Sequence, residues 1–208
     1  MEASTNSPGG ARVRARQARS RETRARLIAA ARAIATEGGL GAIRAEAVAA
    51  QAGVAKGTFF AHFPDKDHLL AELLREELVY APGAGDIPGL LSRLRPLLHA
   101  LASEPESLPV VLRFSGESHD APDLCATITT TTAAISADIA ALQAGGRVRS
   151  GPDAAILGEA CMGLLLHAAG MALFAPAPGI AASAVPLSER LASGEALLKD
   201  MVLALLAP

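Results

Sequence analysis

The sequence has few aromatic residues and no pattern typical of β-strands, and both absences limit the possible fold class. It contains no Trp, one Tyr and five Phe among 208 residues. Long alternating runs of β-branched residues are also missing, whereas Ala and Leu are abundant, and these two residues favour helices. We therefore predict an all-α protein.

Cysteine is scarce as well, and a targeting segment is missing. Cys125 and Cys161 are too few for a disulfide scaffold and lack CxxC spacing, so we predict buried thiols in a reducing cytosol. The first 20 residues have no apolar core of a signal peptide. Residues 160–178 are uncharged and approach the length of a membrane span, but small residues interrupt them, which favours a buried helix. The sequence thus predicts a cytoplasmic protein with no membrane partner.

The motifs of common enzymes do not occur. We find no GxSxG, phosphate-binding loop, HExxH or Ser-His-Asp spacing. The polar cluster from Glu117 to Cys125 contains His119, Asp120 and Asp123, but its spacing fits no standard zinc site and its aspartates suit helix caps. We predict no catalytic residue, no metal and no cofactor.

Neither sign of charge is in large excess, but the charges are unevenly distributed. Residues 1–80 carry twelve Lys and Arg against nine Asp and Glu, a net charge of +3. Residues 81–208 carry seven against twelve, a net charge of −5. A basic first part with an acidic remainder is typical of a DNA-binding domain joined to a partner domain.

The first 19 residues combine Ser, Gly and Pro with four arginines, and Val13 is the only sizeable apolar residue after Met1. This composition predicts a disordered basic arm. Two interpretations stay open. The arm contacts DNA phosphates or the minor groove, or it is a solvated extension that adds only solubility.

The most informative stretch runs from Glu46 to Phe63 and reads EAVAAQAGVAKGTFFAHF. An apolar helical turn leads to Gly53, where a sharp turn with positive φ costs no steric strain. A short helix from Lys56 to Phe63 follows. This spacing is typical of a helix-turn-helix, whose second helix reads the major groove of DNA. Ala52 and Val54 are predicted to fill the space between the two helices.

This stretch resembles the DNA-binding domain of the TetR family of bacterial repressors. The shared pattern is Ala52-Gly53-Val54, Gly57-Thr58, Phe60, His62-Phe63 and Lys66, within roughly residues 20–75. Arg44 and Ala55 depart from the family by replacing a Thr and a Ser that usually cap the two helices, and Phe60 replaces a common Tyr. The candidate DNA contacts are Arg44, Lys56, Gly57, Thr58, Phe59, Phe60, His62 and Lys66.

Further helical stripes follow the helix breaker APGAGDIPG, which begins at Ala81. We predict a three-helix helix-turn-helix domain at residues 20–66 and a helical ligand-binding and dimerisation domain at residues 67–208. The resemblance implies that the last two helices form a homodimer, and one short reading helix contacts too few base pairs alone. It also implies a ligand cavity. The lining candidates are Leu94, Phe114, Glu117, His119, Ile128, Thr129, Thr132, Met162, His167 and Phe174.

Some of these candidates have plainer roles that stay open. His167, predicted to share a helix face with Ile156 and Met171, could be a hydrogen-bonded core histidine. The hydroxyls of Thr129 and Thr132 could bond to carbonyls of their own helix.

These patterns predict a ligand-responsive transcriptional regulator. Its simplest form is a repressor that a small apolar effector releases from a palindromic double-stranded DNA operator. The alternative is a helical small-molecule-binding or interaction protein with altered or lost DNA binding, which the missing capping hydroxyls at positions 44 and 55 keep open.

Overall fold

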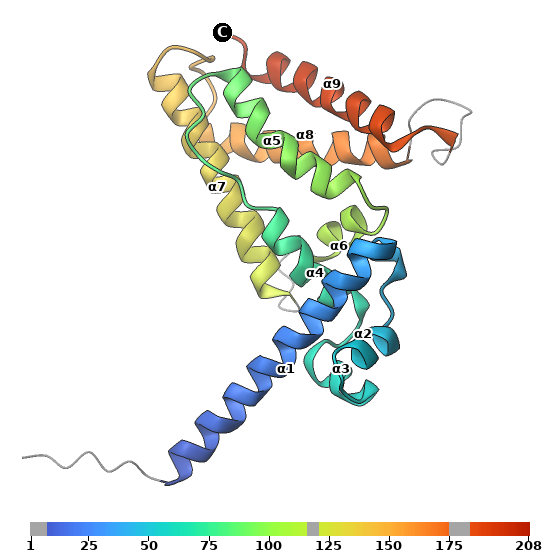
Figure 1. Cartoon of the computed structure of the whole chain (residues 1–208). Helices are drawn as coiled ribbons and strands as arrows, with labels where there is room; N and C mark the ends of the chain where they lie inside the picture. The colour runs from blue at the N-terminus through green and yellow to red at the C-terminus, as the bar shows by residue number, and fades with distance from the viewer. Residues whose placement is uncertain (1–7, 116–120, 175–183) are drawn as a thin grey trace, which may run out of the picture. The chain divides into compact units, whose positions relative to one another are not determined.

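The computed structural model describes residues 8–115, 121–174 and 184–208, with side chains for residues 12–115, 121, 123–174 and 184–208. Over the described residues the chain forms nine α-helices and one short 3₁₀ helix, with no strand (Figure 1). The predicted all-α fold is thereby confirmed. The chain divides into two compact units, Met1–Leu69 and Leu70–Pro208. We call them unit 1 and unit 2.

Unit 1 contains the predicted helix-turn-helix. It is built from α1 (Pro8–Gly38), η1 (Leu40–Ala42), α2 (Ala45–Gln51), α3 (Lys56–His62) and the start of α4 (Lys66–Glu77). The helix α1 packs against η1 and α2, and α2 packs against α3. Fully buried apolar side chains of this kind each stabilise a fold by roughly 1.5 to 3 kcal/mol. In unit 1 the largest of them are Leu27, Ile43, Phe59, Phe63 and Leu69.

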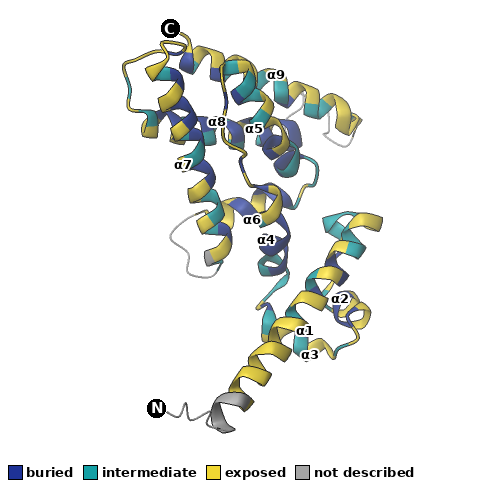
Figure 2. Cartoon of the chain, turned by 60° about the vertical axis from the view of Figure 1, so that its left-hand side comes forward, coloured by how far each residue is buried: buried dark blue, intermediate teal, exposed yellow. Residues whose placement is uncertain are grey.

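The helix α1 begins twelve residues before the predicted start at Ser20. The prediction of a disordered arm is wrong for residues 8–19, which form the first turns of α1, while residues 1–7 lie outside the described residues. The chain from Ala11 to Glu37 contains neither Gly nor Pro, and its Ala, Arg and Gln are strong helix formers. Residues 12–22 are all exposed (Figure 2).

Unit 2 is a helical bundle in which α8 is central. It contains α5 (Ile87–Ala102), α6 (Ser107–Phe114), α7 (Pro122–Ala144), α8 (Ala154–Phe174) and α9 (Leu187–Leu206). The helix α8 packs against α5, α7 and α9. At Gly158 a Cβ would collide with Ser136, so this glycine permits the close approach of α8 to α7. The core includes Leu90, Leu94, Leu98, Ile135, Ile139, Leu165, Leu198 and Val202.

The buried face of α8 differs from the face suggested by the sequence. Ile156, His167 and Met171 share one side, as predicted, but this side is exposed, with Ile156 65% and Met171 38% accessible. The core face is formed by Leu157, Cys161, Leu165 and Ala168. Because α8 is apolar on nearly all sides, its pattern does not indicate which side packs inward.

Two helices, α7 and α8, are long and apolar enough to span a membrane by length and composition alone. Both supply core residues of unit 2, Ile135 and Ile139 from α7 and Leu165 and Ala168 from α8. The part of residues 160–178 that the structure describes, up to Phe174, therefore belongs to a packed helix, as the sequence predicted.

Buried hydrogen bonds attach the segment between α4 and α5 to α7. The Asp138 carboxylate is 6% exposed. It accepts hydrogen bonds from the Tyr80 hydroxyl at 2.7 Å and from the backbone N–H groups of Gly83 and Ala84 at 2.9 Å. The Thr131 hydroxyl donates to the Leu78 carbonyl at 2.7 Å. Burial acts to raise the pKa of Asp138. The hydrogen bonds from Ala84, Tyr80 and Gly83 and the nearby charge of Arg93 outweigh this effect, so the pKa of Asp138 lies below its ordinary value.

Candidate functional site

The turn between α2 and α3 has the predicted geometry. Gly53 has a φ of 65°, Ala52 is buried and Val54 is half-buried. The Arg26 guanidinium of α1 donates to the Ala52 carbonyl, so α1 holds the turn in place. A Cβ at Gly53 would lie 3.1 Å from Arg26 Nη2. The positive φ therefore favours glycine here, and a Cβ would in addition require a small shift of the Arg26 guanidinium.

The exposed residues of α3 are Lys56, Gly57, Phe60 and Ala61, and Phe60 is 47% exposed. Thr58 and His62 are half-buried. A Cβ at Gly57 would meet nothing within 4 Å. Because Gly57 does not have positive φ, the packing of the subunit does not require a glycine there. A bare backbone on an exposed helix allows a partner to approach closely.

The prediction that Phe59 faces outward is wrong. Its side chain is 0% exposed, and its ring packs against those of Phe60 and Phe63, with centroid distances of 5.2 and 5.8 Å. The Arg24 guanidinium lies 5.0 Å from the Phe63 ring centroid. Adjacent residues on an α-helix point about 100° apart, so Phe59 and Phe60 face different directions. Phe59 therefore anchors α3, and Phe60 is the ring available to a partner.

Lys56 lies at the start of α3 between an acidic group and an aromatic ring. It forms an ion pair with Glu46 of α2, and its Nζ is 5.9 Å from the Phe60 ring centroid. The hydrogen bond from Lys56 lowers the pKa of Glu46. Both side chains are more than half exposed, so the ion pair contributes little to stability and Lys56 can exchange the carboxylate for another anion.

The helix starts show which caps are present. Arg44 and Ala55 precede α2 and α3, and neither side chain caps its helix. The Arg44 guanidinium instead donates to the Ile43 carbonyl at 2.8 Å. Asp65 caps α4 by accepting the backbone N–H of His68 at 3.0 Å. Because a missing cap costs about 1 kcal/mol, α2 and α3 depend more on tertiary packing than α4 does.

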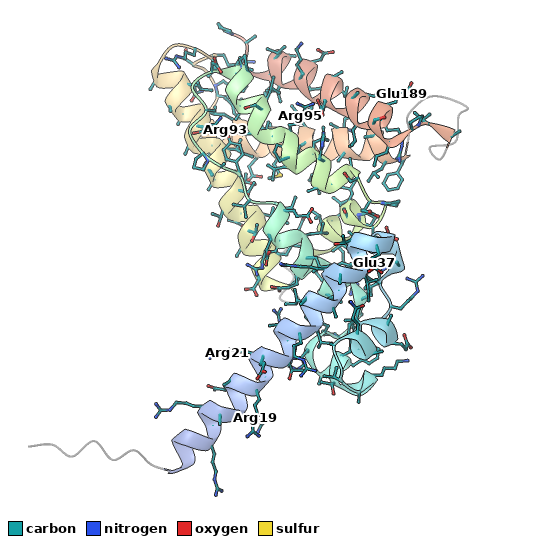
Figure 3. The ribbon with its side chains drawn as sticks, in the orientation of Figure 1. Arg19, Arg21, Glu37, Arg93, Arg95 and Glu189 are labelled. Carbon is teal, nitrogen blue, oxygen red and sulfur yellow. The ribbon has the colours of Figure 1, made fainter. Side chains whose placement is uncertain are left out.

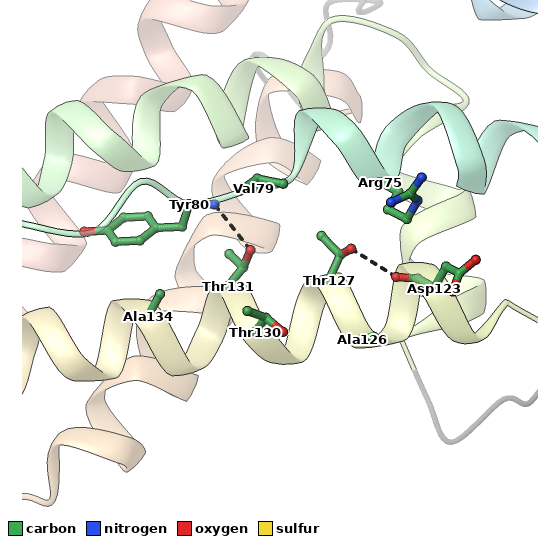
Figure 4. Close-up of a pocket in the computed structure, with 9 residues that line it drawn as sticks. All are labelled: Arg75, Val79, Tyr80, Asp123, Ala126, Thr127, Thr130, Thr131 and Ala134. Atoms are coloured by element: carbon green, nitrogen blue, oxygen red, sulfur yellow. Dashed lines mark hydrogen bonds between the residues drawn. The ribbon is translucent and has the colours of Figure 1, made fainter. Parts of the chain in front are cut away.

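In unit 2 a groove of about 310 Å³ lies between the end of α4 and α7 (Figure 4). Arg75, Val79 and Tyr80 line one side, opposite α7. Arg75 also forms an ion pair with Glu72 at 2.8 Å. Pockets of small-molecule sites begin at roughly this volume. The lining residues from α7 are Asp123, Ala126, Thr127, Thr130, Thr131 and Ala134.

A second, apolar cavity of about 20 Å³ lies deeper in unit 2 and shares Thr131 with the groove. This volume holds one water molecule at most. Of the predicted lining residues, Ile128 and Met162 border this cavity. Its other walls were not predictable from the sequence, because most of them are Leu residues whose helical stripes look like ordinary core. These walls are Leu78, Leu97, Leu101, Val111, Ser115, Thr131, Leu165 and Leu166.

The other predicted ligand residues lie elsewhere. Leu94 and Phe114 are buried in the core and border neither the cavity nor the groove. Phe174 is 60% exposed, and His167 is also exposed, so His167 is not a core histidine within the subunit. Neither residue lines the groove or the cavity.

The polar ligand candidates fall into two groups. The two threonines form hydrogen bonds within their own helix, and the other two residues lie outside the described part of the chain. The hydroxyls of Thr129 and Thr132 donate to the carbonyls of Cys125 and Ile128, at 3.0 Å each, as the alternative reading expected. Glu117 and His119 lie outside the described residues.

No group of three or more His, Cys, Asp or Glu among the described residues is placed to hold a metal ion. Cys161 is fully buried, and desolvation raises the pKa of its thiol to about 12. Cys125 is half-buried and its thiol donates to the Phe114 carbonyl at 2.6 Å.

Comparison with known proteins places the helix-turn-helix in a family. Residues 27–73 match the family described as bacterial regulatory proteins, tetR family. The HTH-type transcriptional repressor KstR of Mycolicibacterium smegmatis is 47% identical over 57 residues. This match covers 27% of our chain and 28% of KstR, so the chain spans less than a third of the length of this curated relative.

Solved structures extend the likeness over most of the chain. A TetR-family transcriptional regulator from Pectobacterium atrosepticum is 27% identical with a TM-score of 0.62, over 92% of our chain and 97% of that protein. FadR of Thermus thermophilus, a repressor solved with lauroyl-CoA, shares the fold with 23% identity and a TM-score of 0.53, over 84% and 92% of the two chains. Residues 27–73 thus match the tetR family of bacterial regulatory proteins, and the likeness to solved structures shows that the same fold extends over most of the chain.

Proposed function

We propose that the protein is a DNA-binding transcriptional regulator that acts as a homodimer in the cytoplasm and responds to a small molecule bound in unit 2. The observation that carries this proposal is the exposed side of α3, where Lys56, Gly57 and Phe60 are free of the core that Phe59 and Phe63 complete. Repression is the favoured direction because the similar KstR is named as a repressor. The proposed DNA contacts are Arg44, Lys56, Gly57, Thr58, Phe60, His62 and Lys66.

Replacing Gly57 with leucine tests this proposal. Leucine is a better helix former, and its Cβ meets open space, so the free energy of unfolding should stay unchanged or rise by up to about 1 kcal/mol. We expect DNA affinity to fall by at least tenfold, because the side chain would occupy the space of a closely approaching duplex. Fluorescence anisotropy with the DNA upstream of the protein's own gene measures this effect.

Ala29→Leu is the matched control, since Ala29 is exposed on the side of α1 opposite its buried residues. Equal affinity of wild type and Gly57→Leu would contradict the proposed docking of α3. Failure of the wild type to bind any duplex in a salt-sensitive, sequence-selective way would instead favour the alternative, a helical binding protein that has lost DNA binding. The uncapped starts of α2 and α3 favour that alternative.

The proposed dimer interface is the exposed apolar side of α8 together with α9. Ile156, Met171 and Phe174 on α8 are 65, 38 and 60% exposed, and Leu203 on α9 is 37% exposed. Gly163 lies on the same side of α8, and a Cβ there would meet nothing within 4 Å. Large apolar side chains exposed along one side of a helix often mark an interface, so we infer that a second copy covers them.

Replacing Gly163 with arginine should separate the subunits without unfolding them. The added side chain has open space in the single subunit but would place a charge and extra volume inside the proposed interface. We expect a dimer for the wild type and a monomer for the variant in analytical ultracentrifugation, with an unchanged circular dichroism spectrum. A variant that remains dimeric would place the interface elsewhere.

The effector is proposed to bind in the groove between α4 and α7. Val79, Ala126 and Ala134 offer apolar contacts, whereas Arg75 and the α7 threonines offer hydrogen bonds, so an effector with both kinds of group fits best. The helix α4 begins at Lys66 in unit 1 and reaches the groove at Arg75 in unit 2. An effector that binds better when α4 is displaced would change the spacing of two α3 helices and release the operator.

A further inference from the structure

We propose that the N-terminal half of α1 is a DNA-binding element in its own right, with one face that contacts the phosphate backbone of a duplex beside α3. This inference rests on the proposed DNA-binding function. The contacting face is formed by Arg12, Arg16 and Arg19, which we call the arginine stripe. Arg14 and Arg21 lie on the opposite side of the helix, and we call them the rear arginines.

The fold of unit 1 does not explain this part of α1. All residues from Arg12 to Glu22 are exposed, and Val13, the only sizeable apolar side chain among them, is 56% accessible (Figure 2). Figure 3 labels Arg19 and Arg21 on the part of α1 that continues past α2 and α3. A helical segment of this length without tertiary packing is only marginally stable in water. A partner that binds this segment would supply the missing stabilisation.

The charges of the segment identify the class of partner. Seven arginines and one acidic residue, Glu22, lie between Arg12 and Arg26. Within the described residues, the arginine stripe forms no ion pair. Its members are three, four and seven positions apart, so their like charges meet on one helix face and oppose helix formation. A polyanion along this face would remove the repulsion.

The direction of the stripe places this partner beside α3. At about 100° per residue, the three arginines fall within a sector of roughly 60°. The same side of α1 carries the buried Leu27 and Ala30 further along, and Arg26, which donates to the Ala52 carbonyl in the turn before α3. The stripe thus continues the side of α1 that faces the helix-turn-helix, past the point where protein covers it.

A nucleic acid duplex fits this face better than a membrane does. Helices that lie on membranes need a broad apolar face, and Val13 alone does not supply one. The stripe extends about 10 Å along the helix axis, whereas a DNA duplex carries one charge per roughly 1.7 Å. When α3 enters a major groove, the stripe can therefore neutralise phosphates next to that groove and lengthen the footprint.

Two double substitutions with the same change in net charge test the proposal. Arg16→Gln with Arg19→Gln removes two charges from the stripe, and Arg14→Gln with Arg21→Gln removes both rear charges. Glutamine is a good helix former, so both variants should fold, and thermal unfolding checks this. The full-length proteins are titrated with the upstream duplex at a series of salt concentrations.

We expect the stripe variant to bind about tenfold more weakly, with the slope of log affinity against log salt smaller by about 2, close to 0.9 for each lost phosphate contact. The rear variant should keep a slope close to that of the wild type. Circular dichroism should also show a gain of helix on DNA addition in the wild type and the rear variant, and a smaller gain in the stripe variant.

Other outcomes overturn the proposal in distinguishable ways. Equal loss of slope in both variants would mean that the arm acts only through its net charge, without a contacting face. Unchanged slopes in both would mean that the arm does not touch DNA, although the proposed function would stand. If the wild type itself shows no salt-dependent binding, the proposed function fails together with this inference.

Discussion

Replacing Phe59 with alanine is expected to lower the free energy of unfolding of unit 1 by about 3 to 5 kcal/mol and to abolish DNA binding. The Phe59 ring is 0% exposed and contacts the Phe60 and Phe63 rings. Since α3 has only seven residues and no side-chain cap, these contacts are the main reason that it stays helical. A loss of this size is a large part of the whole stability of a small domain.

Hydrogen exchange measured by mass spectrometry distinguishes the two units. Peptides from residues 45–63 should exchange faster in Phe59→Ala, whereas peptides from unit 2 should stay protected. The single tyrosine, Tyr80, belongs to unit 2. The unfolding transition measured by its fluorescence should therefore be the same in Phe59→Ala as in the wild type.

Phe60→Ala is the matched control because it removes the same ring from the next position, where the side chain is 47% exposed. We expect a stability change within about 1 kcal/mol but a clear loss of DNA affinity. Comparing Phe59→Ala with Phe60→Ala therefore distinguishes the packing of α3 from its contact with DNA. A stable Phe59→Ala protein that binds DNA normally would contradict the role given to each ring.

Replacing Asp138 with alanine is expected to destabilise unit 2 by about 3 kcal/mol. The change leaves the Tyr80 hydroxyl and the backbone N–H groups of Gly83 and Ala84 without their acceptor. Each buried donor left unpaired costs about 1 to 3 kcal/mol, and such costs are not additive. Tyr80→Phe removes only one of these hydrogen bonds and should cost about 1 kcal/mol. Urea unfolding followed by circular dichroism measures both.

The contribution of Asp138 should also depend on pH with a defined sign. The folded protein holds the pKa of Asp138 below its ordinary value, so its contribution is fully present above the unfolded pKa of about 3.9. It is lost as the pH falls through the folded pKa. The stability difference between wild type and Asp138→Ala should therefore be constant near neutral pH and shrink in acid. A difference that grows in acid would contradict the assignment.

The helix-turn-helix was predictable because its determinants are local. Gly53 has the positive φ that its position in the turn implied, and Ala52 is buried as the spacing indicated. The all-α fold likewise follows from composition. These features depend on a residue and its neighbours within one or two helical turns.

Other features depend on contacts that the sequence pattern does not contain. Two adjacent phenylalanines in α3 look equivalent in the sequence, yet packing against Phe63 buries Phe59 and leaves Phe60 exposed. In α8, apolar residues on every side concealed which face packs inward, so the side that carries His167 was wrongly expected to be buried.

By itself, then, the sequence determined the helical class, the turn of the helix-turn-helix and the basic character of the N-terminal residues, because helix propensity, glycine conformation and charge are properties of short segments. Only the tertiary structure decided that Phe59 is an anchor, that Asp138 holds the link after α4, and that a groove opens beside Arg75. These outcomes arise where side chains far apart in the chain compete for the same buried space and the same hydrogen-bond partners.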